Sequence, residues 1–189
     1  MLRRVKTSNE TRLMAGKSVA LRLVEQRDLD ELYRHSCEFE NKEAFFPARV
    51  YPKSSLRRRF ERDGFWSKID AWVLITDLSH RIVGCLYCFR PHPILQAQEL
   101  AYIIFECSDR GHGYASEALA LFASFLFRTT GIHRLELNIG TENLASIRVA
   151  EKAGFTREAL LRSVWFAPGL DRRVDCYRYA LLREEFFQK

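Results

Sequence analysis

A strand that runs directly into a glycine-rich turn and a long helix is the feature that most constrains the fold of this chain. Residues 99–106 are apolar at nearly every position, which predicts a central strand. The hexapeptide that closes the following turn reads Arg110-Gly111-His112-Gly113-Tyr114-Ala115, and apolar residues at helical spacing then continue to a stop at Gly131. A helix N-terminus presents unpaired N–H groups and a partial positive charge. The unit therefore predicts a site for a di- or polyphosphate.

Within the turn, Gly111 and Gly113 carry no Cβ that would keep a phosphate from the backbone, and Arg110 adds a charge-assisted donor. The spacing differs from the P-loop pattern, G-x-x-x-x-G-K-[ST]. It also differs from the dinucleotide pattern, G-x-G-x-x-G, because Ser116 stands at the third glycine position. The alternative interpretation is that the two glycines only make a turn.

The remaining chain alternates between strand and helix patterns. Strands are predicted at residues 18–24, 71–77, 81–89, 133–139, 155–164 and 174–182, and helices near residues 28–36, 54–66 and 143–153. The order β-α-α-β-β-β-α-β-α-β-β predicts a mixed α/β fold. No repeat or linker divides it, so we expect one domain over residues 17–189 after a basic extension over residues 1–16.

Basic charge is concentrated near the N-terminus. Residues 1–22 hold six basic side chains and one acid, which is +5 of the formal net charge of +6. A short basic segment without interleaved aromatic residues does not predict a nucleic-acid partner. An RNA-binding module stays an alternative, whose affinity would fall steeply with salt. The run Arg57-Arg58-Arg59 is expected on a solvated helix face.

Apolar patterning predicts neither a membrane partner nor a secretory signal. The longest apolar stretch, residues 118–127, is half the length of a membrane span. No apolar block follows the first basic residues, so a cytoplasmic location is expected. Five cysteines without organised spacing predict reduced thiols. Cys85 and Cys88 form a C-x-x-C, but residues three apart on a strand face opposite sides of a sheet, so no metal site is expected.

Four blocks, in this order, resemble the GNAT superfamily of N-acetyltransferases: residues 99–102, 110–118, 134–137 and 143–155. The last block reads N-x-x-S-x-x-x-x-E-K-x-G-F. Within the superfamily the chain resembles the branch that acetylates the N-terminal amines of ribosomal proteins, and residues 161–162 and 179–182 share this resemblance. The likeness covers about residues 17–186.

The resemblance implies a GNAT-like fold, with a mixed, mostly antiparallel central sheet, splayed central strands and about four flanking helices. It implies acetyl-CoA as co-substrate, with the pyrophosphate on the turn from Arg110 through Gly111, His112, Gly113 and Tyr114 to Ala115. It places the pantetheine arm beside Phe105, Glu106 and Cys107, and implies cofactor contacts from Asn143 and Ser146.

Transfer of an acetyl group to an amine requires a neutral amine, a stabilised oxyanion and a proton for the departing thiolate. The resemblance implies Glu99 as the base. Glu106 is the alternative, because the segment from Glu99 to Gly111 is one residue longer than the usual pattern. Ser146 is expected to be the acid, unless it makes only local backbone hydrogen bonds. Asn143 is expected to bind the pantetheine arm, to cap its helix, or to do both.

Aromatic residues are expected around the acceptor, namely Phe45, Tyr51, Trp66 and Trp165, unless they only fill the core. The expected acceptor is the N-terminal amine of a protein. The alternatives are a small amine, such as an antibiotic, a polyamine or an amino acid derivative, or a CoA-binding sensor without catalysis. Homodimer formation stays open.

Overall fold

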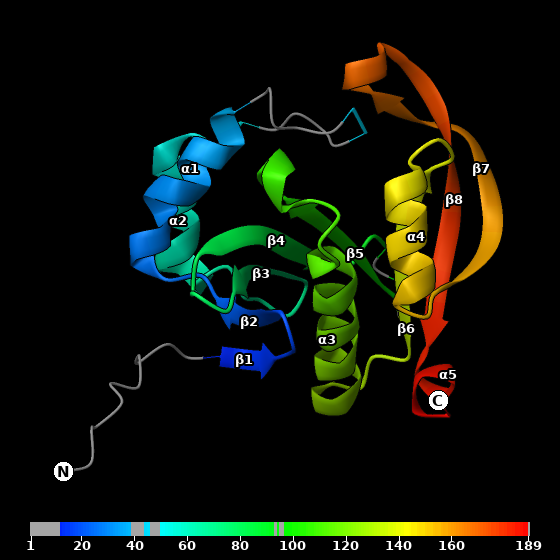
Figure 1. Ribbon diagram of the computed structural model, residues 1–189, viewed down its shortest axis with the longest axis horizontal. Coiled ribbons are helices and arrows are strands. Elements are labelled where there is room, and N and C mark those ends of the chain that lie inside the picture. The colour runs from blue at the N-terminus through cyan, green and yellow to red at the C-terminus, as the bar shows by residue number, and fades with distance from the viewer. Residues whose placement is uncertain (1–11, 39–43, 46–49, 93, 95–96, 189) are drawn as a thin grey trace.

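The computed structural model describes residues 12–38, 44–45, 50–92, 94 and 97–188. Its centre is an eight-stranded sheet with the order β1-β2-β3-β4-β5-β6-β8-β7 (Figure 1). The strands are β1 (Arg12–Ala15), β2 (Val19–Leu23), β3 (Asp70–Asp77), β4 (Ile82–Phe89), β5 (Ala97–Ile104), β6 (Arg134–Gly140), β7 (Thr156–Ala167) and β8 (Arg172–Leu182). The helices are α1 (Leu29–Cys37), α2 (Lys53–Asp63), α3 (Tyr114–Thr129), α4 (Leu144–Lys152) and α5 (Arg183–Phe187).

The sheet is antiparallel except between β5 and β6, which run parallel. These two strands pair only where Ala97–Glu99 face Arg134–Glu136. Beyond Glu99, β5 stays paired with β4 as far as Ile104. The two central strands therefore separate after Glu99, which confirms the expected mostly antiparallel sheet with splayed central strands.

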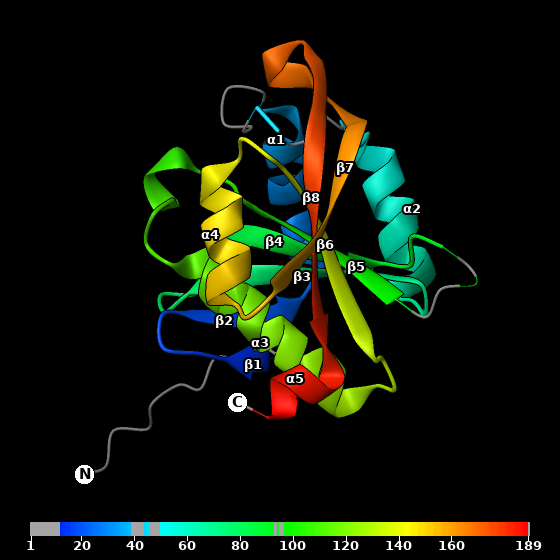
Figure 2. The same ribbon diagram turned by 90° about the vertical axis from the view of Figure 1, so that its right-hand side faces the viewer.

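Helices cover both faces of the sheet. On one face α3 and α4 lie side by side, and α3 buries Leu119 and Phe122 against the strands (Figure 1). On the other face α1 and α2 pack together and bury Leu32 and Leu56 beside Trp72 of β3 (Figure 2). The apolar spacing that predicts these helices thus corresponds to two separate hydrophobic clusters, one on each side of the sheet.

The N-terminal strand β1 is not signalled by the sequence, which places its residues in a basic extension. Arg12–Ala15 pair with β2, and Glu117 of α3 accepts hydrogen bonds from the backbone N–H groups of Lys17 and Ser18. The last residues of the expected extension 1–16 are therefore part of the sheet. Residues 1–11 lie outside the described part of the chain.

The C-x-x-C cysteines lie on opposite faces of β4, as the strand period predicts. Cys85 packs in the cluster under α1 and α2, whereas Cys88 packs in the cluster under α3. Burial raises the pKa of each thiol to about 12. Both cysteines are therefore core side chains in their protonated form. None of the described helices combines the length and the apolar composition that a membrane crossing requires.

Candidate active site

Two cavities meet where β5 and β6 separate. The larger one, of about 710 Å³, lies between the α1 and α2 side of the sheet and the β7–β8 hairpin. The smaller one, of about 290 Å³, lies at the N-terminus of α3. Tyr102, Ile103 and Ser146 line both cavities. An extended ligand in the smaller cavity can therefore present one end to the larger cavity.

The glycine turn forms one wall of the smaller cavity. Gly111 and Gly113 line it with φ angles of 82° and 84°, in the left-handed region that favours glycine, and α3 begins at the next residue, Tyr114. A Cβ built at either glycine would meet no heavy atom within 4 Å. The backbone conformation thus requires glycine, and the space beside the turn is open.

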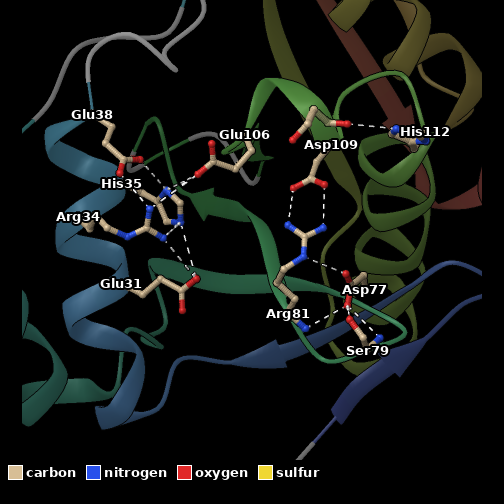
Figure 3. A network of polar contacts seen from close by, with 11 residues as sticks. Glu31, Arg34, His35, Glu38, Asp77, Ser79, Arg81, Glu106, Asp109 and His112 are labelled. Atoms are coloured by element: carbon tan, nitrogen blue, oxygen red, sulfur yellow. Dashed lines mark hydrogen bonds and ion pairs between the residues drawn. The ribbon is translucent and has the colours of Figure 1, made fainter.

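Three basic side chains line the same cavity, namely Arg110, Arg148 and Lys152. Its acidic lining residue, Asp109, forms two hydrogen bonds of 2.7 Å with the guanidinium of Arg81 (Figure 3). This ion pair lowers the pKa of Asp109 and compensates its charge. Together with the start of α3, the cations make the smaller cavity attractive to phosphate groups.

The residues expected to contact the cofactor divide into four groups by the cavity that they line. Arg110, Gly111, Gly113, Tyr114 and Ala115 line the smaller cavity, Ser146 lines both, and Phe105 and Asn143 line the larger one. Glu106, Cys107 and His112 are not among the lining residues of either cavity. His112 hydrogen-bonds instead to the backbone oxygen of Ser108 at 3.1 Å.

Glu106, the alternative base, has its side chain directed toward α1 (Figure 3). Its Oε1 lies 3.8 Å from Nδ1 of His35 and 3.8 Å from Nη1 of Arg34. Glu38 joins the same cluster and accepts a hydrogen bond of 2.9 Å from Arg34. Glu106 is therefore part of an ion-pair cluster that joins the end of β5 to α1.

The start of α4 fixes Ser146 at the junction of the two cavities. Asn143 caps this helix, because its Oδ1 accepts the backbone N–H of Ser146 at 3.0 Å. The hydroxyl of Tyr102 donates to the carbonyl oxygen of Ser146 at 3.2 Å. The capping alternative for Asn143 thus holds, while its side chain also lines the larger cavity.

Glu99 lines the larger cavity at the last position where β5 pairs with β6, directly beside the point where the two strands diverge. Burial raises the pKa of its carboxyl group. A hydrogen bond to the Asn138 side chain and the charge of Arg178 act in the opposite direction, and Glu136 adds to the increase. The Glu99 carboxyl group therefore takes up a proton more readily than that of an exposed glutamate.

Three of the four expected acceptor residues line the larger cavity: Phe45, Tyr51 and Trp165. Trp66 does not, because it packs against Phe125 of α3 in an edge-to-face contact with ring centroids 5.8 Å apart. The backbone turns after α2, and the ring of Trp66 packs against the cluster under α3, on the other side of the sheet from α1 and α2.

A bulge in β7 explains how Trp165 reaches the cavity. The pairing of β7 with β8 slips between Leu161 and Trp165, and Ser163 takes a left-handed φ of 50°. Its backbone N–H is held by Asp175 at 2.7 Å. The slip breaks the two-residue alternation, so that Leu161, Val164 and Trp165 all line the cavity.

Arg59 is a lining residue that the sequence places on a solvated helix face. Its Nη2 donates to Asp70 Oδ2 at 2.6 Å, and its guanidinium lies 4.6 Å from the ring centroid of Trp72. Arg57 is exposed, as expected. The signal for Arg59 was its place three residues after the buried Leu56, on the same side of the helix.

Comparisons with known proteins agree on one family. A family model described as an acetyltransferase (GNAT) domain matches residues 18–156. An uncharacterized N-acetyltransferase, p20 of Bacillus licheniformis, is 34% identical over 76 residues, which are 40% of this chain and 42% of that protein. The probable N-acetyltransferase YjcK of Bacillus subtilis is 25% identical over 162 residues, which are 79% of this chain and 87% of that protein. The chain thus spans less than half the length of p20 and most of YjcK.

Solved structures match the fold at lower identity. A spermidine N-acetyltransferase from Vibrio cholerae, in complex with CoA and spermine, superposes with a TM-score of 0.76 at 18% identity, covering 89% of this chain and 98% of that one. An acetyltransferase of the GNAT family from Bacillus anthracis gives 0.72 at 22% identity, covering 90% and 98%.

Proposed function

The chain belongs to the GNAT family of acetyltransferases, and on that premise we propose that it moves an acetyl group from acetyl-CoA to a primary monoamine with an apolar body. The observation that carries the proposal is the junction of the two cavities. One cavity is suited to phosphates, the other is walled by aromatic rings, and a half-buried glutamate, Glu99, lines the second.

The smaller cavity fits the phosphate part of acetyl-CoA. Arg110 and the open N-terminus of α3 would hold the pyrophosphate, and Arg148 and Lys152 would compensate further phosphate charge. When bound, acetyl-CoA supplies an activated acetyl thioester. The shared lining residues Tyr102 and Ser146 mark where its reactive end would meet the acceptor.

Glu99 is proposed as the base. A lysine-like amine has a pKa of about 10.4 and an α-amine one of about 8, so either must lose a proton before its nitrogen can attack. Glu99 lines the acceptor cavity and has a raised carboxyl pKa, which favours uptake of that proton. Ser146 is proposed as the proton donor on the cofactor side, where its position at the start of α4 is fixed by Asn143.

The charges that line the larger cavity favour an acceptor with a single amine. Among the described lining residues, Asp70 and Glu99 are acidic and Arg59 and Arg178 are basic. Burial and the charge of Arg34 lower the pKa of His35, the lining histidine, which favours its neutral form. A polyamine such as the spermine in the Vibrio cholerae complex carries several ammonium groups. These residues offer no surplus of negative charge to match them.

A protein N-terminus is the second candidate acceptor, because an α-amine also carries a single charge. The resemblance to the ribosomal-protein branch supports this candidate. The aromatic walls formed by Tyr51, Trp72, Tyr87 and Trp165 would then receive the first side chains of the peptide.

A comparison of three acceptors tests the proposal. The protein is incubated with acetyl-CoA and 2-phenylethylamine, spermidine or a hexapeptide that begins with serine, and both CoA thiol release and product mass are followed. We expect the highest kcat/KM with 2-phenylethylamine. A preference for spermidine would overturn the charge argument, and a preference for the peptide would establish the second candidate. Binding of CoA without any acetylated product would identify a CoA-binding sensor.

A further inference from the structure

Three polar side chains from three neighbouring strands face the larger cavity next to one another. Glu99 of β5 lies opposite Glu136 of β6, and Asn138 follows two residues along on the same side of that strand. Asn138 in turn lies directly opposite Arg178 of β8. Glu99, Asn138 and Arg178 all line the cavity. The sheet register thus brings an amide between a carboxylate and a guanidinium.

The hydrogen bond between Arg178 and Asn138 fixes the direction of the amide. Nε of Arg178 donates to Oδ1 of Asn138 at 3.2 Å. A guanidinium is a donor only, so the amide atom that faces it must be the oxygen. The NH₂ group of the amide then lies on the side away from Arg178, and the Asn138 side chain acts to lower the pKa of Glu99, its neighbour in the cavity wall. The contact with Arg178 therefore determines the orientation of the Asn138 amide relative to Glu99.

The groups around Glu99 determine how strongly its charged form is favoured or disfavoured. Burial disfavours the charged carboxylate, and Glu136, which lies on the neighbouring strand and is itself paired with Arg134 at 2.6 Å, adds repulsion. Cys176, buried on β8, lines the same cavity as Glu99. On β4 the residue opposite Glu99 is Phe89, which carries no charge. Among these neighbours of Glu99, Asn138 and Arg178 favour the charged form of its carboxyl group.

We propose that Arg178 and Asn138 are positioning residues for the reaction: Arg178 orients the Asn138 amide, and the amide holds the Glu99 carboxylate ionised and directed into the acceptor cavity. This inference rests on the proposed role of Glu99 as the base. It assigns no contact with substrate to Asn138, and it gives Arg178 a function besides filling the wall of the cavity.

A titration of Glu99 itself tests the inference without an acceptor. Protein labelled with ¹³C at the glutamate side-chain carboxyl carbons is titrated by NMR, and the Glu99 signal is assigned by its absence in Glu99→Gln. We expect the midpoint of Glu99 to move to higher pH in Arg178→Met, because the donor and the charge are both lost. Arg178→Lys, which keeps a cation and a donor, should bring the midpoint back toward the wild-type value.

Matched variants separate this role from general damage to the fold. Arg173→Met changes an exposed arginine of the same strand that contacts the backbone oxygen of Ser163, and it should leave the midpoint unchanged. Asn138→Leu removes the amide without removing the charge of Arg178, and it should also raise the midpoint. This second variant keeps the inference testable if Arg178→Met does not fold.

Kinetics distinguish a failure of this inference from a failure of the proposed function. With 2-phenylethylamine as the acceptor, Arg178→Met should lose activity on the acidic side of its pH profile and recover it at higher pH. An unchanged Glu99 midpoint and an unchanged profile in both Arg178→Met and Asn138→Leu would overturn the positioning role and leave Glu99 as the base. Full activity in Glu99→Gln would instead overturn the base, and the positioning role with it.

Discussion

Replacement of Gly113 by alanine separates the backbone strain of the glycine turn from its role in binding. Gly113 precedes α3 with φ of 84°, and a left-handed backbone costs a non-glycine residue about 1–2 kcal/mol. A Cβ at this position meets no heavy atom within 4 Å, so no clash within the chain adds to that cost. In a chain of this size 1 kcal/mol corresponds to about 2–4 °C in Tm. We therefore expect Gly113→Ala to lower Tm by about 2–8 °C.

Gly64 provides a matched control for this variant. It ends α2 with φ of 60°, a Cβ there also meets no heavy atom within 4 Å, and it lines neither cavity. Gly64→Ala should therefore lose a similar amount of stability in the absence of ligand. The two variants differ in one respect, because only the Cβ at residue 113 enters the space beside the turn where a phosphate would approach the backbone.

The assay is thermal unfolding with and without CoA. At about 100 times its dissociation constant, CoA stabilises the wild-type protein by about 2.7 kcal/mol, which corresponds to about 5–11 °C at this chain length. Gly64→Ala should keep that increase, and Gly113→Ala should lose most of it at the same CoA concentration. An undiminished increase in Gly113→Ala would refute the assignment of the turn as the phosphate site.

Glu99, the ion pair beside the turn and the buried cysteines give three further tests. Because the pKa of Glu99 is raised, stability declines as pH rises through it, so Glu99→Gln should increase the free energy of unfolding in urea at pH 7; a decrease would contradict the burial argument. The pKa of Asp109 is lowered, so its pair with Arg81 stabilises the fold at neutral pH and loses effect as pH falls through that pKa. Asp109→Asn should thus lose about 1–3 kcal/mol at pH 7 and less in acid, and a constant difference across that range would count against the ion pair. Cys85 and Cys88 should resist alkylation in the folded protein, as checked by mass spectrometry, because burial raises each thiol pKa to about 12; rapid labelling would show that they are accessible.

The glycine turn and α3 could be predicted from the sequence because their determinants are local. The glycines at positions 111 and 113 are required by the φ angle of each residue itself, and the helix follows from apolar spacing along one segment. The separation of β5 from β6 was implied by the family resemblance, whereas the register that shows it, Ala97–Glu99 against Arg134–Glu136, joins segments far apart in the chain.

The composition of the larger cavity depends on contacts that no single segment encodes. Arg59 lines the cavity because its guanidinium binds Asp70 and packs against Trp72, both of β3. The run of three arginines in the sequence does not reveal these partners. Trp66 shows the opposite case, since its ring packs against the core beside α3 although Arg59 and Asp70, which flank it in the sequence, line the cavity. Strand β1 could not be predicted because this four-residue segment, Arg12–Ala15, forms a strand through its pairing with β2.

The network around Glu99 is a further case of contacts that the sequence alone does not reveal. Asn138 and Arg178 stand forty residues apart and meet through the register of β6 with β8. Their residue types alone indicate nothing about a base on β5. The polar environment of the proposed base therefore comes from sheet topology, whereas Glu99 itself could be proposed from the sequence.

The most direct test of the central claim is the rate of formation of acetylated 2-phenylethylamine from radiolabelled acetyl-CoA, measured side by side for the wild-type protein and Glu99→Gln. We expect the wild-type protein to form the acetylated amine and Glu99→Gln to form it about 10²- to 10⁴-fold more slowly, with CoA binding retained in both. Equal rates in the two proteins, or CoA binding without labelled product from this amine, spermidine or a peptide, would contradict the claim that Glu99 serves acetyl transfer at this junction.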